Sequence, residues 1–221
     1  MIDIRQIPAE SSLLDEKTKE TIAGVFAKLT RDVTLKAVVD LNEERSAEMA
    51  SFLACLSGLS PHVKTELYTP EEGAGFAMDT EHLPATGLFL EDSYSGAAFH
   101  GVPGGKEINS FVIGIYNLAG PGQEIARGTV KKIEKISRPV HLQICVSLAC
   151  HHCPGVVIAC QRIAMLSPHV TAEMYDANLY PDLVERFGID RVPLVAVNGQ
   201  DRFLGPRTIE DLVQLCRDAA H

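Results

Sequence analysis

Two cysteines, Cys150 and Cys153, are separated by two residues at a point where an extended apolar run gives way to a helical pattern. At such a junction the first thiol lies at the positive end of a helix, where free backbone N–H groups stabilise a thiolate. The second thiol lies one helical turn further on, within reach to close a disulfide with the first. The pair therefore predicts two-electron thiol–disulfide exchange, in which Cys150 attacks a disulfide and Cys153 resolves the mixed disulfide.

The two residues between the thiols are His151 and His152. An imidazole beside a thiolate favours the charged sulfur, so we expect at least one of them to tune Cys150. The alternative is that both are ordinary surface residues. The cysteines could also be half of a zinc site, which needs two further ligands. The candidates for these ligands are Cys145, Cys160, His151 and His152. Because Cys145 lies on a strand and Cys160 lies two turns further along the helix, redox chemistry is favoured.

Residues 59–68 return as residues 166–175, with seven of ten positions identical at an offset of 107. A match of this length predicts that the chain contains two copies of one fold. A Gly-Pro-Gly run at 120–122 is the expected boundary, which gives a first domain at 1–121 and a second domain at 122–221.

The same offset places Glu43 and Ser46 of the first copy opposite Cys150 and Cys153 of the second. The first copy therefore has no thiol pair, and only the second can carry out the exchange. We expect the first copy to act as a scaffold, as a docking surface, or as both.

Hydrophobic periodicity and turn residues give the second copy the element order β-α-β-α-β-β-α. Its expected elements are a strand at 140–147, a helix at 153–166, a strand at 170–176, a helix at 179–187, hairpin strands at 193–197 and 201–204, and a final helix. Thr208, with Asp211 three residues on, predicts the start of that final helix. The first copy gives a shorter set: strands at 33–40, 63–68 and 86–91, helices at 43–57 and 106–118, and an irregular stretch at 69–83. Helices at about 12–29 and 123–136 are expected to precede the two copies.

This order of elements, with a Cys-x-x-Cys on a helix and Val192-Pro193 before a hairpin, resembles the thioredoxin fold. The chain as a whole resembles the N-terminal, tandem-thioredoxin-fold domain of the bacterial alkyl hydroperoxide reductase flavoprotein, through residues 99–107, 147–154 and 188–199. Archaeal protein disulfide oxidoreductases, of the same thioredoxin/glutaredoxin superfamily, resemble it less closely. The resemblance implies an α/β fold class: two tandem thioredoxin-like folds, with a mixed sheet in each, packed together.

The resemblance also implies roles for residues outside the dithiol motif. The Val192–Pro193 bond would be cis, and the backbone of Val192 would face the thiols and pair with the extended backbone of a substrate. An ordinary proline at the start of a strand is the alternative. Glu107 would be lent by the first copy to the redox centre of the second, in two copies that pack face to face. The alternative for Glu107 is a first-turn carboxylate that only stabilises its own helix.

The function that the resemblance implies is an electron relay from a thioredoxin-reductase-like flavoprotein to a peroxiredoxin of the alkyl hydroperoxide reductase type. We expect the chain itself to bind no cofactor, because it has no Gly-x-Gly-x-x-Gly motif. Flavin and nicotinamide would be held by a partner or by a missing domain, since the chain is either free-standing or a fragment of a longer flavoprotein. A general protein disulfide reductase or isomerase, and a non-catalytic metal-binding or adaptor module, are the alternatives.

Charge and composition argue against other classes of function. The formal net charge of -9 disfavours a nucleic-acid or anionic-membrane surface, both of which need clustered Lys and Arg. No apolar run approaches the ~20 residues needed to span a bilayer. The first residues show no basic region followed by an apolar stretch, so no secretory signal is expected. We therefore expect the compartment to be the cytoplasm and the six cysteines to be reduced or catalytic.

Overall fold

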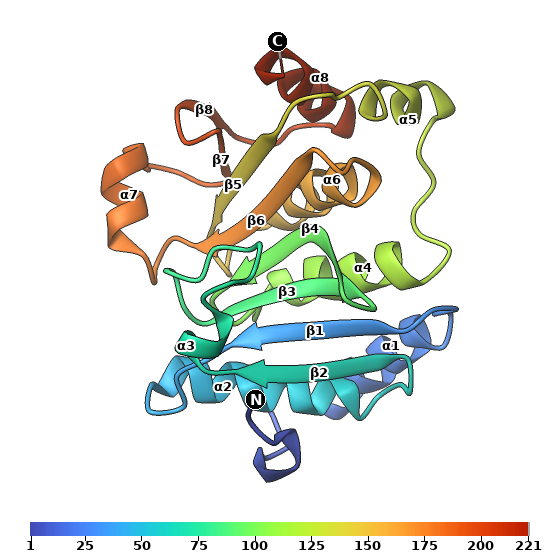
Figure 1. Cartoon of the computed structure of the whole chain (residues 1–221), viewed down its shortest axis with the longest axis vertical. Coiled ribbons are helices and arrows are strands. Elements are labelled where there is room, and N and C mark those ends of the chain that lie inside the picture. The colour runs from blue at the N-terminus through green and yellow to red at the C-terminus, as the bar shows by residue number, and fades with distance from the viewer. Residues whose placement is uncertain (221) are drawn as a thin grey trace.

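The computed structural model describes residues 1–220 and contains one continuous eight-stranded sheet within them. The strands lie in the order β2-β1-β3-β4-β6-β5-β7-β8 (Figure 1). They are β1 (Val33–Val38), β2 (Val63–Tyr68), β3 (Ala85–Leu90), β4 (Ser93–His100), β5 (Val140–Val146), β6 (Val170–Asp176), β7 (Leu194–Val197) and β8 (Asp201–Leu204). The helices are η1 (Ile4–Gln6), α1 (Glu16–Phe26), α2 (Glu44–Ser57), α3 (Pro70–Gly73), α4 (Glu107–Ala119), α5 (Arg127–Ile133), α6 (Cys153–Leu166), α7 (Pro181–Phe187) and α8 (Ile209–Ala219).

The sheet consists of two units with the same strand order, β2-β1-β3-β4 and β6-β5-β7-β8. In each unit the first two strands in this order are parallel and joined through a helix, α2 or α6, whereas the other neighbours within the unit are antiparallel. Strand β5 begins 107 residues after β1, and β6 begins 107 residues after β2, as the sequence repeat requires. The expected α/β fold class of two tandem thioredoxin-like folds is confirmed.

The two units meet edge to edge, through the parallel strands β4 and β6. Ala97 lies opposite Ala172 across this junction, and His100 lies opposite Tyr175. The expectation that the two copies pack face to face was therefore wrong. This expectation failed because β4 was not anticipated as a strand. Strand β4 begins with small and polar residues, and the residues of its second half are all buried instead of alternating between buried and exposed, as is typical of a central strand. The boundary between residues 121 and 122 stays a prediction.

Local capping decides where several helices begin. Helix α1 starts after Asp15, whose carboxylate accepts the Thr18 N–H at 2.8 Å, so it is shorter than the helix expected at 12–29. Helix α5 is likewise shorter than expected. The reciprocal capping box of Thr208 and Asp211 starts α8, as predicted.

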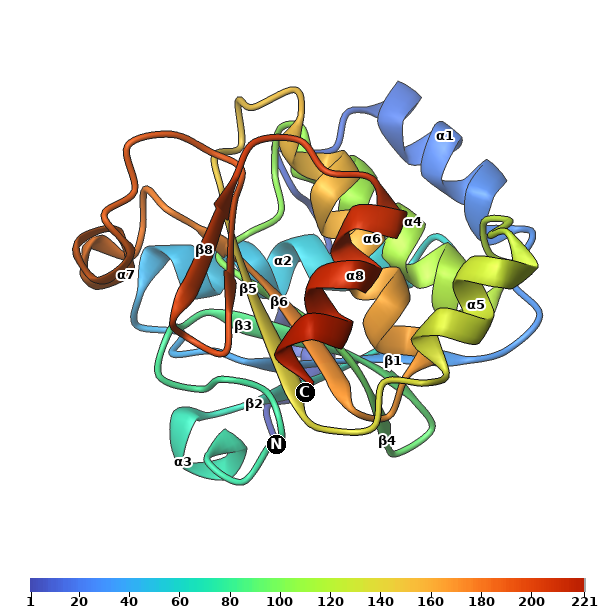
Figure 2. The ribbon, with the colours of Figure 1, turned by 90° about the horizontal axis from the view of Figure 1, so that it is seen from above.

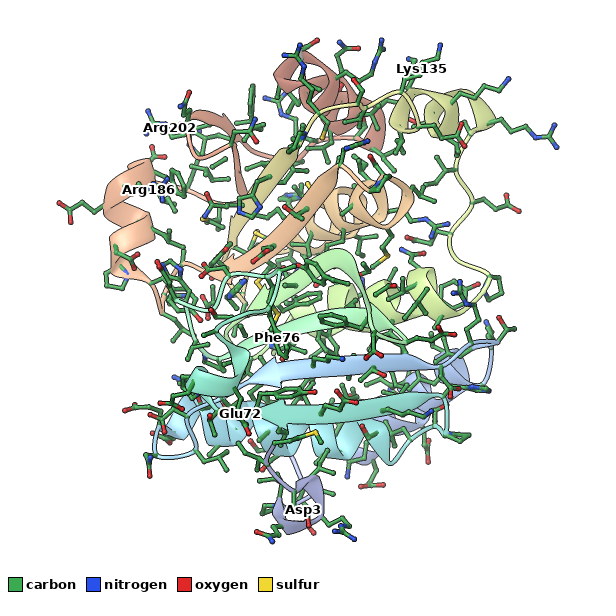
Figure 3. The ribbon with its side chains drawn as sticks, viewed as in Figure 1. Asp3, Glu72, Phe76, Lys135, Arg186 and Arg202 are labelled. Atoms are coloured by element: carbon green, nitrogen blue, oxygen red, sulfur yellow. The ribbon has the colours of Figure 1, made fainter. Side chains whose placement is uncertain are left out.

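The two faces of the sheet are covered differently. Helices α2, α4, α6 and α8 lie on one face and enclose the main core, whereas α3 lies on the other (Figure 2). Phe76, labelled in Figure 3, packs with Val38 and Ala85 on this second face. Arg202 on β8, also labelled there, donates a hydrogen bond to the Phe187 carbonyl at the end of α7. Helix α6 packs against both α4 of the first unit and α8 of the second. The helix that carries the dithiol motif is therefore fixed from two sides.

Candidate active site at the start of helix α6

Cys150 lies in the loop between β5 and α6, and its sulfur faces the start of the helix. The Cys153 N–H donates a hydrogen bond to Cys150 Sγ at 3.2 Å, and the Cys150 N–H donates to the Ser147 carbonyl at 2.9 Å. A backbone donor at this position stabilises negative charge on the sulfur, as does the positive end of the helix. Cys150 is half-buried and both thiols are free, so Cys150 is the sulfur that a disulfide can reach.

Cys153 differs from Cys150 because it is fully buried at the first position of α6. Burial raises the pKa of the Cys153 thiol well above its ordinary value, and Cys150 and the charge of Glu107 raise it further. Cys153 is therefore held as a neutral thiol and needs to lose its proton before it can attack.

His151 and His152 are both exposed, and within residues 1–220 no hydrogen bond joins either imidazole to a thiol. The tuning role stays a prediction.

The loop before β7 brings a backbone carbonyl to the nucleophile. The Val192–Pro193 peptide bond is cis, as the resemblance implied, and Val192 O lies 4.0 Å from Cys150 Sγ. The Pro193 carbonyl accepts the Gly205 N–H at 2.9 Å, which ties this loop to the end of β8. Val192 is half-buried, so its backbone borders the surface around Cys150.

Glu107, the first residue of α4, is fully buried although its side chain is ionisable. Its Oε2 accepts a hydrogen bond from Ser110 Oγ, and its Oε1 has no partner among the described residues. Burial raises the pKa of Glu107 to about 7, with a smaller upward contribution from Asp176 and an opposing contribution from Ser110. The charge of Glu107 contributes to the raised pKa of Cys153, and no hydrogen bond joins the two side chains among the described residues. The role of Glu107 in the redox centre stays a prediction.

The loop that leads into α4 also touches the loop that carries Cys150. The Lys106 N–H donates to the Leu148 carbonyl at 2.9 Å. Gly105 has a φ of +54°, and a Cβ at this position would lie 2.5 Å from Leu148 O. Only glycine fits this approach without displacement, so the first unit supports the active-site loop of the second directly.

Sequence reasoning missed one polar residue of this site, Ser110. It lies three residues after Glu107 on the same helix, a spacing at which helical side chains meet, and this was the available signal.

The other cysteines, Cys145, Cys160, Cys216 and Cys55, are buried. Burial raises the pKa of both Cys145 and Cys216 to about 12.

Neither a cluster of metal ligands nor a membrane-spanning helix occurs in the part of the chain that the structure describes. Within residues 1–220, no group of three or more His, Cys, Asp or Glu side chains is arranged to hold a metal ion. No helix in that range is both long enough and apolar enough to cross a membrane.

The fold and the dithiol at the start of α6 define a thiol–disulfide oxidoreductase of the thioredoxin class. In agreement, residues 140–216 match the thioredoxin domain family. The structure is similar to that of the alkyl hydroperoxide reductase protein AhpF of Enterococcus faecalis (V583), with a TM-score of 0.87, 33% identity, and coverage of 93% of this chain and 100% of that one. A second structure from that organism, an N-terminal domain of AhpF, has a TM-score of 0.86 at 34% identity and covers 92% of this chain and 99% of that one. The chain belongs to the family of AhpF N-terminal domains.

Curated relatives are longer than this chain. The AhpF-type alkyl hydroperoxide reductase protein of Staphylococcus aureus (strain Mu50) is 26% identical over 172 residues, which are 78% of this chain and 32% of that protein. "NADH dehydrogenase" of Bacillus subtilis (strain 168) is 25% identical over 201 residues, which are 91% of this chain and 37% of that protein. The chain therefore spans about a third of the length of these relatives.

Proposed function

We propose that the chain relays electrons from a thioredoxin-reductase-like flavoprotein to a peroxiredoxin by dithiol–disulfide exchange. One observation carries the proposal: Cys150 Sγ is held at the start of α6 by the Cys153 N–H and beside Val192 O, in a chain of the AhpF family. The alternative is a general protein disulfide reductase, which the same site could serve with a broader range of substrates.

The exchange has two steps. The Cys150 thiolate attacks one sulfur of the partner's disulfide, a mixed disulfide forms, and the first partner thiolate leaves. Cys153 then loses its proton and attacks Cys150 Sγ, the Cys150–Cys153 disulfide forms, and the second partner thiolate leaves. The partner gains two electrons and takes up two protons, and the relay is oxidised by the same two electrons. A dithiol of the electron donor reverses both steps and restores the reduced relay.

Glu107 serves the second step as the base. Its buried carboxyl has a pKa raised to about 7 by desolvation, so a substantial fraction is ionised at neutral pH and available to take the proton from Cys153. When the disulfide is reduced again, the proton held by Glu107 returns to the Cys153 sulfur and the neutral thiol is restored.

Val192 and Pro193 serve the first step by binding. The extended segment that carries the substrate's disulfide would lie beside the Val192 backbone, whose carbonyl is already 4.0 Å from the attacking sulfur.

The flavin and nicotinamide chemistry lies outside these residues. A nucleotide site needs a glycine-rich turn between a strand and a helix, and the sequence has no Gly-x-Gly-x-x-Gly motif. We place both cofactors on a partner chain or on the remainder of a longer protein. We propose the cytoplasm as the compartment, because thiols are kept reduced there and a dithiol relay depends on that.

A single-turnover competition tests the proposal. The reduced chain is mixed with equal amounts of a disulfide-form peroxiredoxin of the alkyl hydroperoxide reductase type and of insulin, and the reduction of each is followed. We expect the peroxiredoxin to be reduced faster by about a hundredfold, since binding energy from contacts with a specific partner adds to the chemistry of the thiols. Equal rates would instead indicate a general disulfide reductase, and no reduction of either substrate would contradict a relay function.

A further inference from the structure

Glu107 and Ser110 form an isolated polar pair inside the interface between the two units. Both residues are fully buried, and they lie one turn apart at the start of α4. Ser110 Oγ lies 2.9 Å from the Glu107 backbone carbonyl and is also hydrogen bonded to the carboxyl Oε2. A hydroxyl has one hydrogen, so it can donate to only one of these two oxygens at a time.

The second oxygen of the carboxyl is left open. Glu107 Oε1 is buried and has no hydrogen-bond partner among the described residues. The two titratable groups whose charge couples to this carboxyl are Asp176 at the end of β6 and Cys153 at the start of α6. Within residues 1–220, Ser110 is therefore the side-chain donor to a carboxyl that is otherwise desolvated and faced by another carboxylate.

We infer that Ser110 is the positioning residue for Glu107: its hydroxyl holds Oε2, leaves Oε1 without a partner among the described residues, and lets the carboxyl carry a charge in a buried site. This inference rests on the proposed role of Glu107 in the relay. The proton from Cys153 Sγ moves to the Glu107 carboxylate, and no other bond is made or broken in that transfer.

The energetics support this role for Ser110. A buried carboxylate with no hydrogen bond stays protonated at neutral pH and cannot accept a proton. One hydrogen bond to a charged group shifts that balance by about one pH unit, which is enough to bring ionisation into the neutral range. Burial and Asp176 act in the opposite direction, and the pKa of Glu107, raised to about 7, reflects this competition.

The test compares Ser110→Ala with Ser110→Thr, which keeps the hydroxyl, and with Ser46→Ala as a control for loss of a buried serine hydroxyl in the first turn of another helix, α2. The first readout is the titration of the Glu107 carboxyl carbon by NMR in the reduced chain alone, with the signal assigned through Glu107→Gln. We expect Ser110→Ala to raise the midpoint by about one pH unit. Ser110→Thr and Ser46→Ala should leave it near the original value.

The second readout is the closure of the Cys150–Cys153 disulfide. A coloured aromatic disulfide reagent first reacts with Cys150, and release of its second coloured thiolate reports the attack by Cys153. In Ser110→Ala this phase should slow about fivefold at pH 7 and recover at pH 9, where the carboxyl is ionised again. Recovery at high pH also shows that the variant is folded.

The outcomes separate two possible failures. An unchanged midpoint in Ser110→Ala, or an equal loss of rate at every pH, would overturn the positioning role even if the relay to a peroxiredoxin is real. A shifted midpoint with no transfer to any peroxiredoxin would retain Ser110 as the residue that sets the ionisation of Glu107 and would reject only the relay.

Discussion

Burial gives two thiols three residues apart different chemistry. Cys150 is half-buried and accepts a backbone N–H, whereas Cys153 is fully buried and its pKa is raised by desolvation. The spacing of the two cysteines and their place at a strand-to-helix junction were enough to predict the pair, because both can be recognised from neighbouring residues in the sequence. Glu107 could be reached only through the family resemblance, because its interaction with α6 depends on packing between the two units. Ser110 was missed although its spacing from Glu107 on the same helix was a local signal.

At this scale we expect Glu107→Gln to slow closure of the Cys150–Cys153 disulfide by about tenfold to a hundredfold at pH 7, the lower part of what a positioned base contributes. Its charge also raises the pKa of Cys153, so in a Cys150→Ser background Glu107→Gln should lower the pH at which Cys153 is alkylated. Glu44→Gln, which removes an equivalent first-turn carboxylate from α2, is the control. Equal small effects of the two variants would reduce Glu107 to a helix-stabilising carboxylate.

At the scale of elements, the site depends on a loop from the other unit. The residues before α4 contact the loop after β5 through the Lys106 N–H and through Gly105. The sequence predicted most helices and strands that bound these loops, since they follow a clear period. It did not predict β4, because the residues of its buried half do not alternate between apolar and polar. The contact between the loop before α4 and the active-site loop could therefore not be derived from the sequence pattern alone.

Gly105→Ala tests this contact. The added Cβ would lie 2.5 Å from Leu148 O in a backbone conformation with a φ of +54°, so the active-site loop has to shift. We expect a loss of about 1–3 kcal/mol in the free energy of unfolding by urea, and slower reaction of Cys150 with disulfides. Gly128→Ala on α5 meets nothing within 4 Å and should be neutral or slightly stabilising. If both variants behave alike, the contact is not important for the site.

At the scale of the whole molecule, buried ionisable groups line the junction of the two units. His100 on β4 pairs with Glu173 on β6 at 2.7 Å, with both side chains almost fully buried. His82 bridges Asp79 at 2.6 Å and Asp182 on α7 at 2.8 Å. The sequence repeat predicted two copies of one fold, but it carried no information on the edge at which they join, because the partners across that edge lie far apart in the chain.

This network predicts a pH dependence of stability. The hydrogen bond to Asp79 raises the pKa of His82 to about 9, so its stabilisation is fully present below the unfolded value of about 6.5 and is lost as the pH rises through about 9. His82→Gln should cost about 1–3 kcal/mol of unfolding free energy at pH 6 and much less at pH 10. His62→Gln, which removes a pair with Asp32 that is 39% and 48% exposed, should cost less than about 1 kcal/mol. A cost for His82→Gln that is the same at both pH values would contradict the proposed charge on His82.

The nucleophile of the relay can be identified directly by trapping its covalent intermediate. Cys153→Ser is incubated with a disulfide-form peroxiredoxin of the alkyl hydroperoxide reductase type, and the products are separated without reductant and mapped by mass spectrometry. We expect a mixed disulfide between the peroxiredoxin and Cys150, because the residue that would resolve it is gone. The original chain should pass through this species without accumulating it, and Cys150→Ser should form none. Absence of the adduct in Cys153→Ser, or its formation through another cysteine in Cys150→Ser, would contradict the assignment of Cys150 as the attacking thiol.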